Sequence, residues 1–136
     1  MVKHITALTS LLGVAIVAGA GAATPPSLYT SSQATAGATV YAQNCATCHG
    51  AQLQGQAAPA LLGQSFAAPT NHYTVGVIFS EIAEQMPAGE PGSLSHTEYE
   101  NVMAYILSKN GYPAGGSALN YKASLGSSVP LVSAVK

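Results

Sequence analysis

Apolar positions with helical spacing first occur between Ser32 and Asn44. Small and apolar residues fall three, four and seven positions apart there, at Ala34, Gly37, Ala38 and Tyr41, so they share one face of a helix. Ser31 and Ser32 are both suitable N-caps, because a hydroxyl accepts a hydrogen bond from a free amide of the first turn. The pattern predicts a first helix over this range.

The next stretch, residues 51–70, has no sustained period. Glycine and proline interrupt it repeatedly, at Gly55, Pro59, Gly63 and Pro69, and these two residue types are the strongest breakers of regular structure. We expect a loop here, with room for one short helical turn. Such a loop wraps around something rather than forming a core element.

A second helical pattern runs from Thr74 to Gln85, with apolar residues at Val75, Ile78, Phe79 and Ile82. It must end near Met86, because Pro87 follows and the residue before a proline is disfavoured in the helical region. Residues 87–94 are rich in proline and glycine. We therefore expect a loop between this helix and the next one.

The third helical pattern is the clearest. Ser95 and Glu98 form a capping box, in which each side chain satisfies a free amide at the helix start. One apolar stripe follows, at Tyr99, Val102, Met103, Ile106 and Leu107. Gly111 and Pro113 end this helix. Because no segment alternates as a strand does, the expected fold class is all-α.

The chain beyond Gly111 allows two interpretations. Its glycines and serines indicate a flexible extension, whereas four larger residues, Leu119, Tyr121, Leu125 and Leu131, could lie against the domain surface. The length of 136 residues suits one domain. We expect a signal peptide at 1–22, one domain at 32–113 and a C-terminal extension at 114–136.

The N-terminus has the layout of an export signal. Lys3 gives a positive start, Ile5 to Ala18 is an apolar run of suitable length, and small residues follow. Cleavage of the A-x-A type is expected after Ala20 or Ala22. The alternative is an uncleaved membrane anchor, but glycines interrupt the run and it is short for a span of ~20 residues. Cleavage of the signal would also remove His4 and would leave no stable membrane span.

Composition narrows the functions that are compatible with this chain. Only 7% of the residues are charged and 7% are aromatic, with no Trp, so a cofactor would supply apolar bulk that the side chains lack. Arginine is absent, and the four lysines stand against five glutamates. Nucleic acid is therefore not an expected partner, because nothing here could neutralise a run of phosphates.

The segment Cys45-Ala46-Thr47-Cys48-His49 carries the chemistry. Two thiols at i and i+3 can form thioether bonds to the two vinyl groups of one haem, and the adjacent imidazole then lies beneath the iron as an axial ligand. With two Cys and four His in the chain, this arrangement arises by chance on the order of one time in a thousand. We therefore predict one covalently bound haem c and its iron.

Two other sites use the same thiols. A redox dithiol has its C-x-x-C at a helix start after a strand, and no strand is predicted before Cys45. A zinc site would need two further ligands besides Cys45 and Cys48, yet His49, His72 and His96 lack the usual paired spacing. Both alternatives fit the sequence less well than haem attachment.

The motif Cys45–Gly50 behind a first helix, followed by a proline-rich loop, a Met-Pro pair and an amphipathic helix, resembles a monohaem class I cytochrome c over Ser32 to Pro113. The chain is also similar to small bacterial cytochromes that serve quinoprotein dehydrogenases or terminal oxidases. The resemblance implies that the first and last helices cross where Gly37 and Tyr41 meet Tyr105. Glycine allows a close backbone approach at such a crossing, and aromatic rings fill it.

Met86 is the expected sixth ligand of the iron. It follows an amphipathic helix and opens a loop, and the family has its ligand methionine in this place, often before proline. A neutral thioether favours ferrous iron and raises the reduction potential. Met103 fits a core position better. His72 is the alternative ligand, and His96 is assigned no chemistry.

Two further residues follow from the resemblance. Pro59 matches a family proline whose carbonyl accepts a hydrogen bond from the proximal histidine, which orients the imidazole. Its other interpretation is a simple loop breaker. Tyr73 is expected, by analogy alone, to reach a haem propionate.

The expected function is electron transfer in the periplasm or outside the cell, by a protein that is not itself an enzyme. Its partners would be redox proteins such as a dehydrogenase, a membrane cytochrome complex or a terminal oxidase. Two alternatives remain: the haem subunit of a dehydrogenase complex, or a haem enzyme or gas sensor if Met86 does not bind iron. Because the mature chain keeps only three lysines, association should depend weakly on salt.

Overall fold

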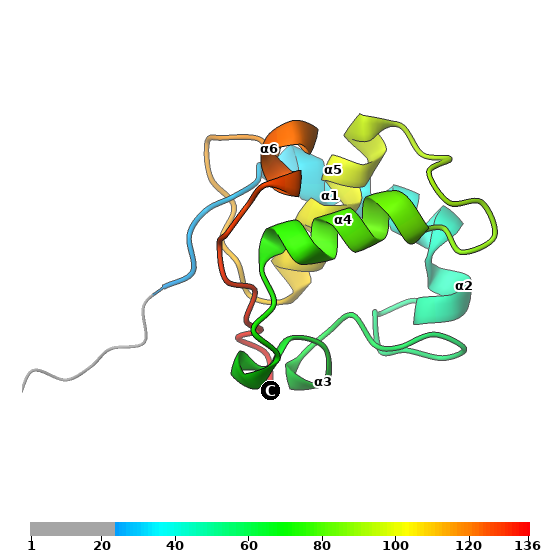
Figure 1. Ribbon diagram of the computed structural model, residues 1–136, viewed down its shortest axis with the longest axis horizontal. Coiled ribbons are helices and arrows are strands. Elements are labelled where there is room, and N and C mark those ends of the chain that lie inside the picture. Colours follow the sequence, from blue (N-terminus) through cyan, green and yellow to red (C-terminus); the bar gives the residue numbers. More distant parts are fainter. Residues whose placement is uncertain (1–23) are drawn as a thin grey trace, which may run out of the picture.

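The computed structural model describes residues 24–136, and the predicted signal peptide lies outside them (Figure 1). The helices are α1 (Ser31–Asn44), α2 (Ala46–His49), α3 (Gln64–Ala67), a 3₁₀ turn at Pro69–Asn71, α4 (Val75–Gln85), α5 (His96–Lys109) and α6 (Tyr121–Leu125). Within residues 24–136 no strand forms, and one isolated bridge joins Thr74 to Pro130. The all-α prediction is confirmed.

The first helix begins one residue earlier than expected, and its cap is Thr30 rather than Ser31 or Ser32. The Thr30 hydroxyl accepts from the Gln33 amide, and the Gln33 side chain accepts from the Thr30 amide. This reciprocal pair is a capping box of the T-x-x-Q kind. It outcompetes a lone serine because it satisfies two free amides instead of one. The predicted Ser95–Glu98 capping box is confirmed at the start of α5.

Helices α1 and α5 cross at the predicted residues. A Cβ added at Gly37 would overlap the carbonyl of Asn101 on α5, so only glycine permits this backbone approach. The rings of Tyr41 and Tyr105 lie 5.3 Å apart between centroids, tilted by 49°. The crossing fixes the end of α1, from which the cysteine motif continues.

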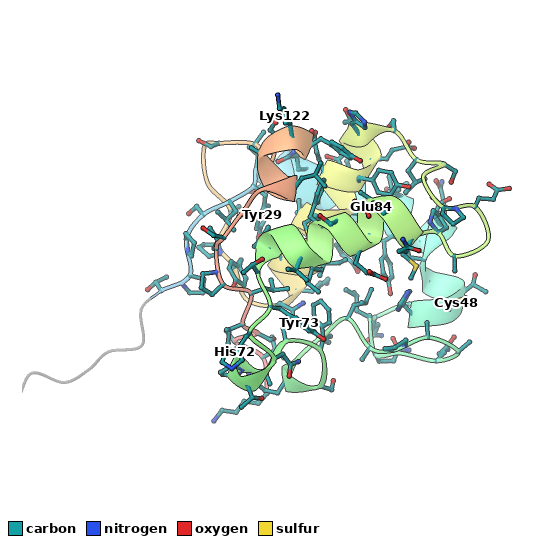
Figure 2. The ribbon with its side chains drawn as sticks, in the orientation of Figure 1. Tyr29, Cys48, His72, Tyr73, Glu84 and Lys122 are labelled. Atoms are coloured by element: carbon teal, nitrogen blue, oxygen red, sulfur yellow. The ribbon has the colours of Figure 1, made fainter. Side chains whose placement is uncertain are left out.

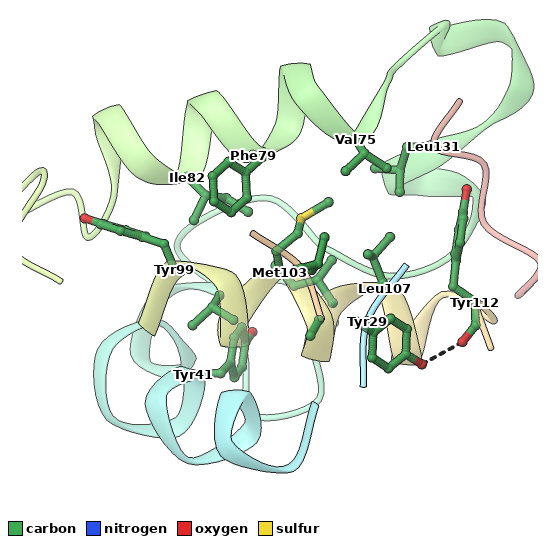
Figure 3. Packing of buried hydrophobic residues seen from close by; sticks show 14 of the residues in the cluster. Tyr29, Tyr41, Val75, Phe79, Ile82, Tyr99, Met103, Leu107, Tyr112 and Leu131 are labelled. Atoms are coloured by element: carbon green, nitrogen blue, oxygen red, sulfur yellow. Dashed lines mark hydrogen bonds between the residues drawn. The ribbon is translucent and has the colours of Figure 1, made fainter. Parts of the chain in front are cut away.

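The hydrophobic core lies where α4 covers α5 (Figure 3). Phe79 from α4 and Met103 from α5 are fully buried, which confirms the core position predicted for Met103. Tyr99 is also buried between these helices. At the other end of the core the Tyr29 hydroxyl donates to the carbonyl of Tyr112 at 2.7 Å. The core therefore contains tyrosine hydroxyls that are bonded to main-chain carbonyls.

The C-terminal segment packs against the domain. After α6 the chain descends toward α3 (Figure 1), with Leu131 fully buried. The Tyr112 hydroxyl donates to Pro130 O and accepts from the Val132 amide. Of the two interpretations that the sequence allowed, the packed one is found for Leu119, Tyr121 and Leu131, whereas Leu125 is exposed. No helix among the described residues is both long and apolar enough to cross a bilayer.

Candidate functional site

The two cysteines lie where the chain passes from α1 into α2. The Cys45 amide still donates to Tyr41 O, but Cys45 leaves helical geometry at φ −124°, and α2 then turns through a single short segment. Gly50, at φ +84°, ends α2, and the Tyr41 hydroxyl donates to its carbonyl at 2.7 Å. This turn presents Cys45 and Cys48, three residues apart, to the same side of the protein.

The segment after the motif, residues 50–59, is here called the CXXCH loop. It folds back on the motif through the main chain: Ala58 N–H donates to Cys48 O at 2.9 Å, and Gly55 N–H donates to His49 O at 2.7 Å. His49 is buried, with 8% of its surface exposed, and its Nδ1 lies 2.8 Å from Pro59 O. Because a carbonyl can only accept, Nδ1 carries the proton, and Nε2 keeps its lone pair.

A cavity of about 540 Å³ has residues of α4 in its wall. This size is within the roughly 300–1,000 Å³ of small-molecule and cofactor sites. Cys45, Cys48, His49 and Met86 all line it, and so do Pro59 and Tyr73. Its remaining wall includes apolar side chains from several elements, among them Leu61, Phe66, Ile78, Ile82, Val102 and Ile106. Two thiols, one imidazole and one thioether in an apolar cavity form a donor set that fits a covalently held haem.

Met86 stands at the end of α4 and opens a second loop. Its amide donates to Ile82 O, which closes the last helical turn, and its backbone then becomes extended at φ −118° and ψ 153°. Residues 86–94, here called the Met86 loop, connect α4 to α5. The Tyr99 hydroxyl on α5 donates to Met86 O at 2.7 Å. The sequence had assigned Tyr99 to the core alone.

The remaining candidates are placed as follows. Tyr73 is 36% exposed and belongs to the cavity wall. His72 adopts a left-handed backbone, with φ +52°, and is exposed outside the cavity lining. Figure 2 shows Cys48 on α2, Tyr73 below α4, and His72 farther from the helix. The structure gives no support to the alternative of His72 as ligand, because its side chain is exposed and is not part of the cavity lining, although its neighbours Asn71 and Tyr73 are.

Sequence reasoning missed Asn110, which is completely buried at the end of α5. Its Oδ1 accepts from the Gly63 amide at 3.0 Å, and its Nδ2 donates to Leu61 O at 2.9 Å. It thereby ties a cavity-lining segment to α5. The only signal was an Asn-Gly pair at a helix end, which usually marks a simple C-cap.

The environment of the thiols does not favour a redox dithiol. Burial raises the pKa of the Cys45 thiol to about 11, whereas reactive cysteines have a lowered pKa. Both cysteines are free thiols in this structure. Across residues 24–136, no three His, Cys, Asp or Glu side chains gather as they would around a metal ion, and a structural zinc site needs four ligands.

Comparisons with known proteins bear on the family and the fold of this chain. The sequence profile of a family described as cytochrome c oxidase, cbb3-type, subunit III, matches residues 32–106. Thiosulfate dehydrogenase from Stutzerimonas stutzeri (strain A1501) is 38% identical over 79 residues, which are 53% of this chain and 26% of that protein. The chain thus spans only a minor part of that relative's length.

A solved structure shares the arrangement of the helices. The crystal structure of the sulfane dehydrogenase SoxCD from Paracoccus pantotrophus superposes with a TM-score of 0.56 at 19% sequence identity. The match covers 86% of this chain and 68% of that chain. At this identity the likeness concerns the fold alone.

Proposed function

Because this chain belongs to the family described as cytochrome c oxidase, cbb3-type, subunit III, we propose that it is an exported electron carrier with His49 and Met86 as axial ligands of one haem iron. The protein is a small c-type cytochrome with a class I cytochrome c fold, and it binds haem c covalently. Its role is electron transfer. The axial ligands, the cellular compartment and the partners are the parts that we propose.

One observation carries the proposal: a single apolar cavity is lined by both cysteines, by His49 and by Met86. Cys45 lies between α1 and α2, Cys48 and His49 belong to α2, and Met86 directly follows α4, 37 positions after His49. A methionine that served only as core filler would not need to lie at this cavity. Met103, which is fully buried on α5 and is not part of the cavity lining, shows the difference.

Each residue has a distinct task in this proposal. The Cys45 and Cys48 thiols would hold the haem by thioether bonds, and the bound haem supplies a reversible Fe(III)/Fe(II) couple. Pro59 O holds the Nδ1 proton of His49, which fixes the imidazole and makes Nε2 a better donor. The Met86 thioether would occupy the opposite position and keep small ligands out. Tyr73 is proposed to reach a haem propionate.

Optical spectra of the purified holoprotein test this assignment. With both axial positions filled, the oxidised protein should show a methionine-to-iron charge-transfer band in the near infrared. The reduced protein should bind carbon monoxide very slowly, because no coordination position is open. A missing band together with rapid carbon monoxide binding would instead indicate an open iron, as in a haem enzyme or gas sensor.

A second candidate is the haem subunit of a dehydrogenase complex. The similarity to thiosulfate dehydrogenase over 79 residues favours it. If this candidate is correct, the cytochrome should co-migrate with a substrate-dependent, dye-reducing dehydrogenase activity during gel filtration of a native extract. Thiosulfate is the first substrate to supply. A free carrier would instead elute at the size of the monomer, apart from any dehydrogenase.

Export is proposed from the sequence of residues 1–22. The mature protein, isolated from a periplasmic extract, should begin at Gly21 or Ala23, as read by N-terminal sequencing or mass spectrometry. Retention of Met1 on a membrane-bound holoprotein would contradict cleavage. It would favour the uncleaved anchor instead.

A further inference from the structure

The Met86 loop has very few attachments to the rest of the protein. Residues 88–93 are all exposed, and the hydrogen bonds of Glu90, Gly92 and Ser93 remain inside the loop. The Met86 amide donates to Ile82 O and closes the last turn of α4. Every other hydrogen bond between the main chain of the loop and the rest of residues 24–136 is made by one side chain. That side chain is Tyr99.

The Tyr99 hydroxyl contacts both ends of this loop. It donates to Met86 O at 2.7 Å, and it accepts from the Leu94 amide at 3.4 Å. The same oxygen therefore joins Met86, the first residue of the loop, to Leu94, the last one. A loop that is held at both ends by one hydroxyl has fewer open conformations than a loop held by its helices alone.

The position of this hydroxyl is itself well determined. Tyr99 is 2% exposed, and its ring lies in the core between α4 and α5 (Figure 3). It stands directly after the Ser95–Glu98 capping box, which fixes the first turn of α5. The ring of Tyr121 on α6 lies 6.4 Å away between centroids. The loop is thus attached to a rigid part of the core.

We propose that Tyr99 is a positioning residue for the methionine ligand, holding the Met86 carbonyl through its hydroxyl so that the thioether remains at the iron. The inference rests on the proposed function, because it requires Met86 to be the ligand. Without the hydroxyl, the loop gains open conformations. The sulfur then leaves the iron more often, and the iron becomes accessible to a small ligand.

The test compares Tyr99→Phe with Tyr29→Phe in the holoprotein. The two variants are matched, because each tyrosine is buried and each loses one hydroxyl that donates to a main-chain carbonyl at 2.7 Å. Tyr29, however, bonds to Tyr112 and not to the Met86 loop. A general loss of stability should therefore affect both variants, whereas a loss of ligand positioning should affect only one.

Two readouts follow ligation directly. Removal of one hydrogen bond of this kind changes an equilibrium by about fivefold, so ferrous Tyr99→Phe should bind carbon monoxide about five times faster than wild type. On heating, the near-infrared band should disappear before the protein unfolds. The interval between these two temperatures should be larger in Tyr99→Phe than in wild type. Tyr29→Phe should match wild type in both readouts, even if it unfolds at a lower temperature.

The outcomes separate this inference from the proposed function. If wild type shows the near-infrared band but Tyr99→Phe equals Tyr29→Phe in both readouts, the positioning role of Tyr99 is overturned while His49/Met86 ligation stands. If wild type itself lacks the band and binds carbon monoxide rapidly, the proposed ligation is wrong, and the role of Tyr99 is overturned with it.

Discussion

The two loops that border the cavity are held in different ways. The CXXCH loop is closed locally, by main-chain bonds from Gly55 and Ala58 to the motif and by the bond between the His49 imidazole and Pro59 O. The Met86 loop is exposed through most of its length and is attached at its ends to one tyrosine hydroxyl. The histidine side is thus rigid by local structure, whereas the methionine side depends on a distant residue. The methionine side should be the easier one to open.

The largest expected effect is on the rigid side, where the attachment is covalent. Replacing both Cys45 and Cys48 by Ala should abolish covalent haem binding, because no other cysteine is present in the chain. Haem staining after denaturing electrophoresis measures this directly. Thr47→Ala is the matched control: Thr47 lies between the cysteines and is exposed, so staining should remain. Stained protein in the double variant would contradict the assignment of the thioethers.

The next effect is on the methionine side. Met86→Ala should leave the haem attached but open one axial position, so that the near-infrared band disappears and ferrous protein binds carbon monoxide rapidly. The reduction potential should fall, because the thioether that favours ferrous iron is lost. Met103→Leu, a volume-conserving change in the core, should cost less than about 1.5 kcal/mol and keep the band. An unchanged band in Met86→Ala would show that another residue is the ligand.

A smaller effect distinguishes the two loops by stability. Gly55 in the CXXCH loop has φ +83°, and an added Cβ would lie 2.7 Å from the Ala60 amide nitrogen. Gly55→Ala should therefore lower the free energy of unfolding by about 2 kcal/mol, measured by denaturant titration. Gly89 in the Met86 loop is the control, because an added Cβ meets nothing within 4 Å.

Gly89→Ala should thus remain within about 0.5 kcal/mol of wild type. Neither variant should accelerate carbon monoxide binding, because neither removes the bonds of Tyr99. Equal costs at the two glycines would show that the CXXCH loop is no more rigid than the Met86 loop.

Local signals predicted most of the fold. Apolar spacing and proline at residue 87 placed α1, α4 and α5, because a helix depends on neighbours three and four residues away. The cysteine motif identified the cofactor, since its chemistry is confined to five consecutive residues. Crossing partners such as Gly37 and Tyr105 came only from the resemblance, because no local pattern specifies which helices meet.

Features that depend on distant contacts were not predicted. The sequence left the C-terminal segment undecided, and its packing depends on Tyr112, which lies 18 residues before Pro130. Asn110 contacts segments 47 and 49 residues away. Tyr99 belongs to the apolar stripe of α5, and this predicted that its ring is buried. Nothing in the sequence indicated the hydrogen-bond partner of its hydroxyl.

The smallest expected effect concerns charge at the two loops. The CXXCH loop carries no Lys, Arg, Asp or Glu, and the Met86 loop carries only Glu90. Electrostatic steering by these two loops should therefore be weak. Oxidation of the reduced protein by anionic ferricyanide and by cationic hexaammineruthenium(III) measures it, because steering would give the two oxidants opposite dependences on ionic strength.

We expect the rate constant for each oxidant to change by less than about twofold as salt shortens the Debye length from roughly 30 Å to roughly 8 Å. Glu90→Gln removes the only charge in the two loops and should shift the two rates toward each other by an even smaller factor. Steep and opposite salt dependences in wild type would mean that charges outside the two loops steer the oxidants, first of all Glu81, which lines the cavity, and its neighbour Glu84 on α4. The difference that governs electron entry would then lie between the nearly uncharged loops and the charged face of α4.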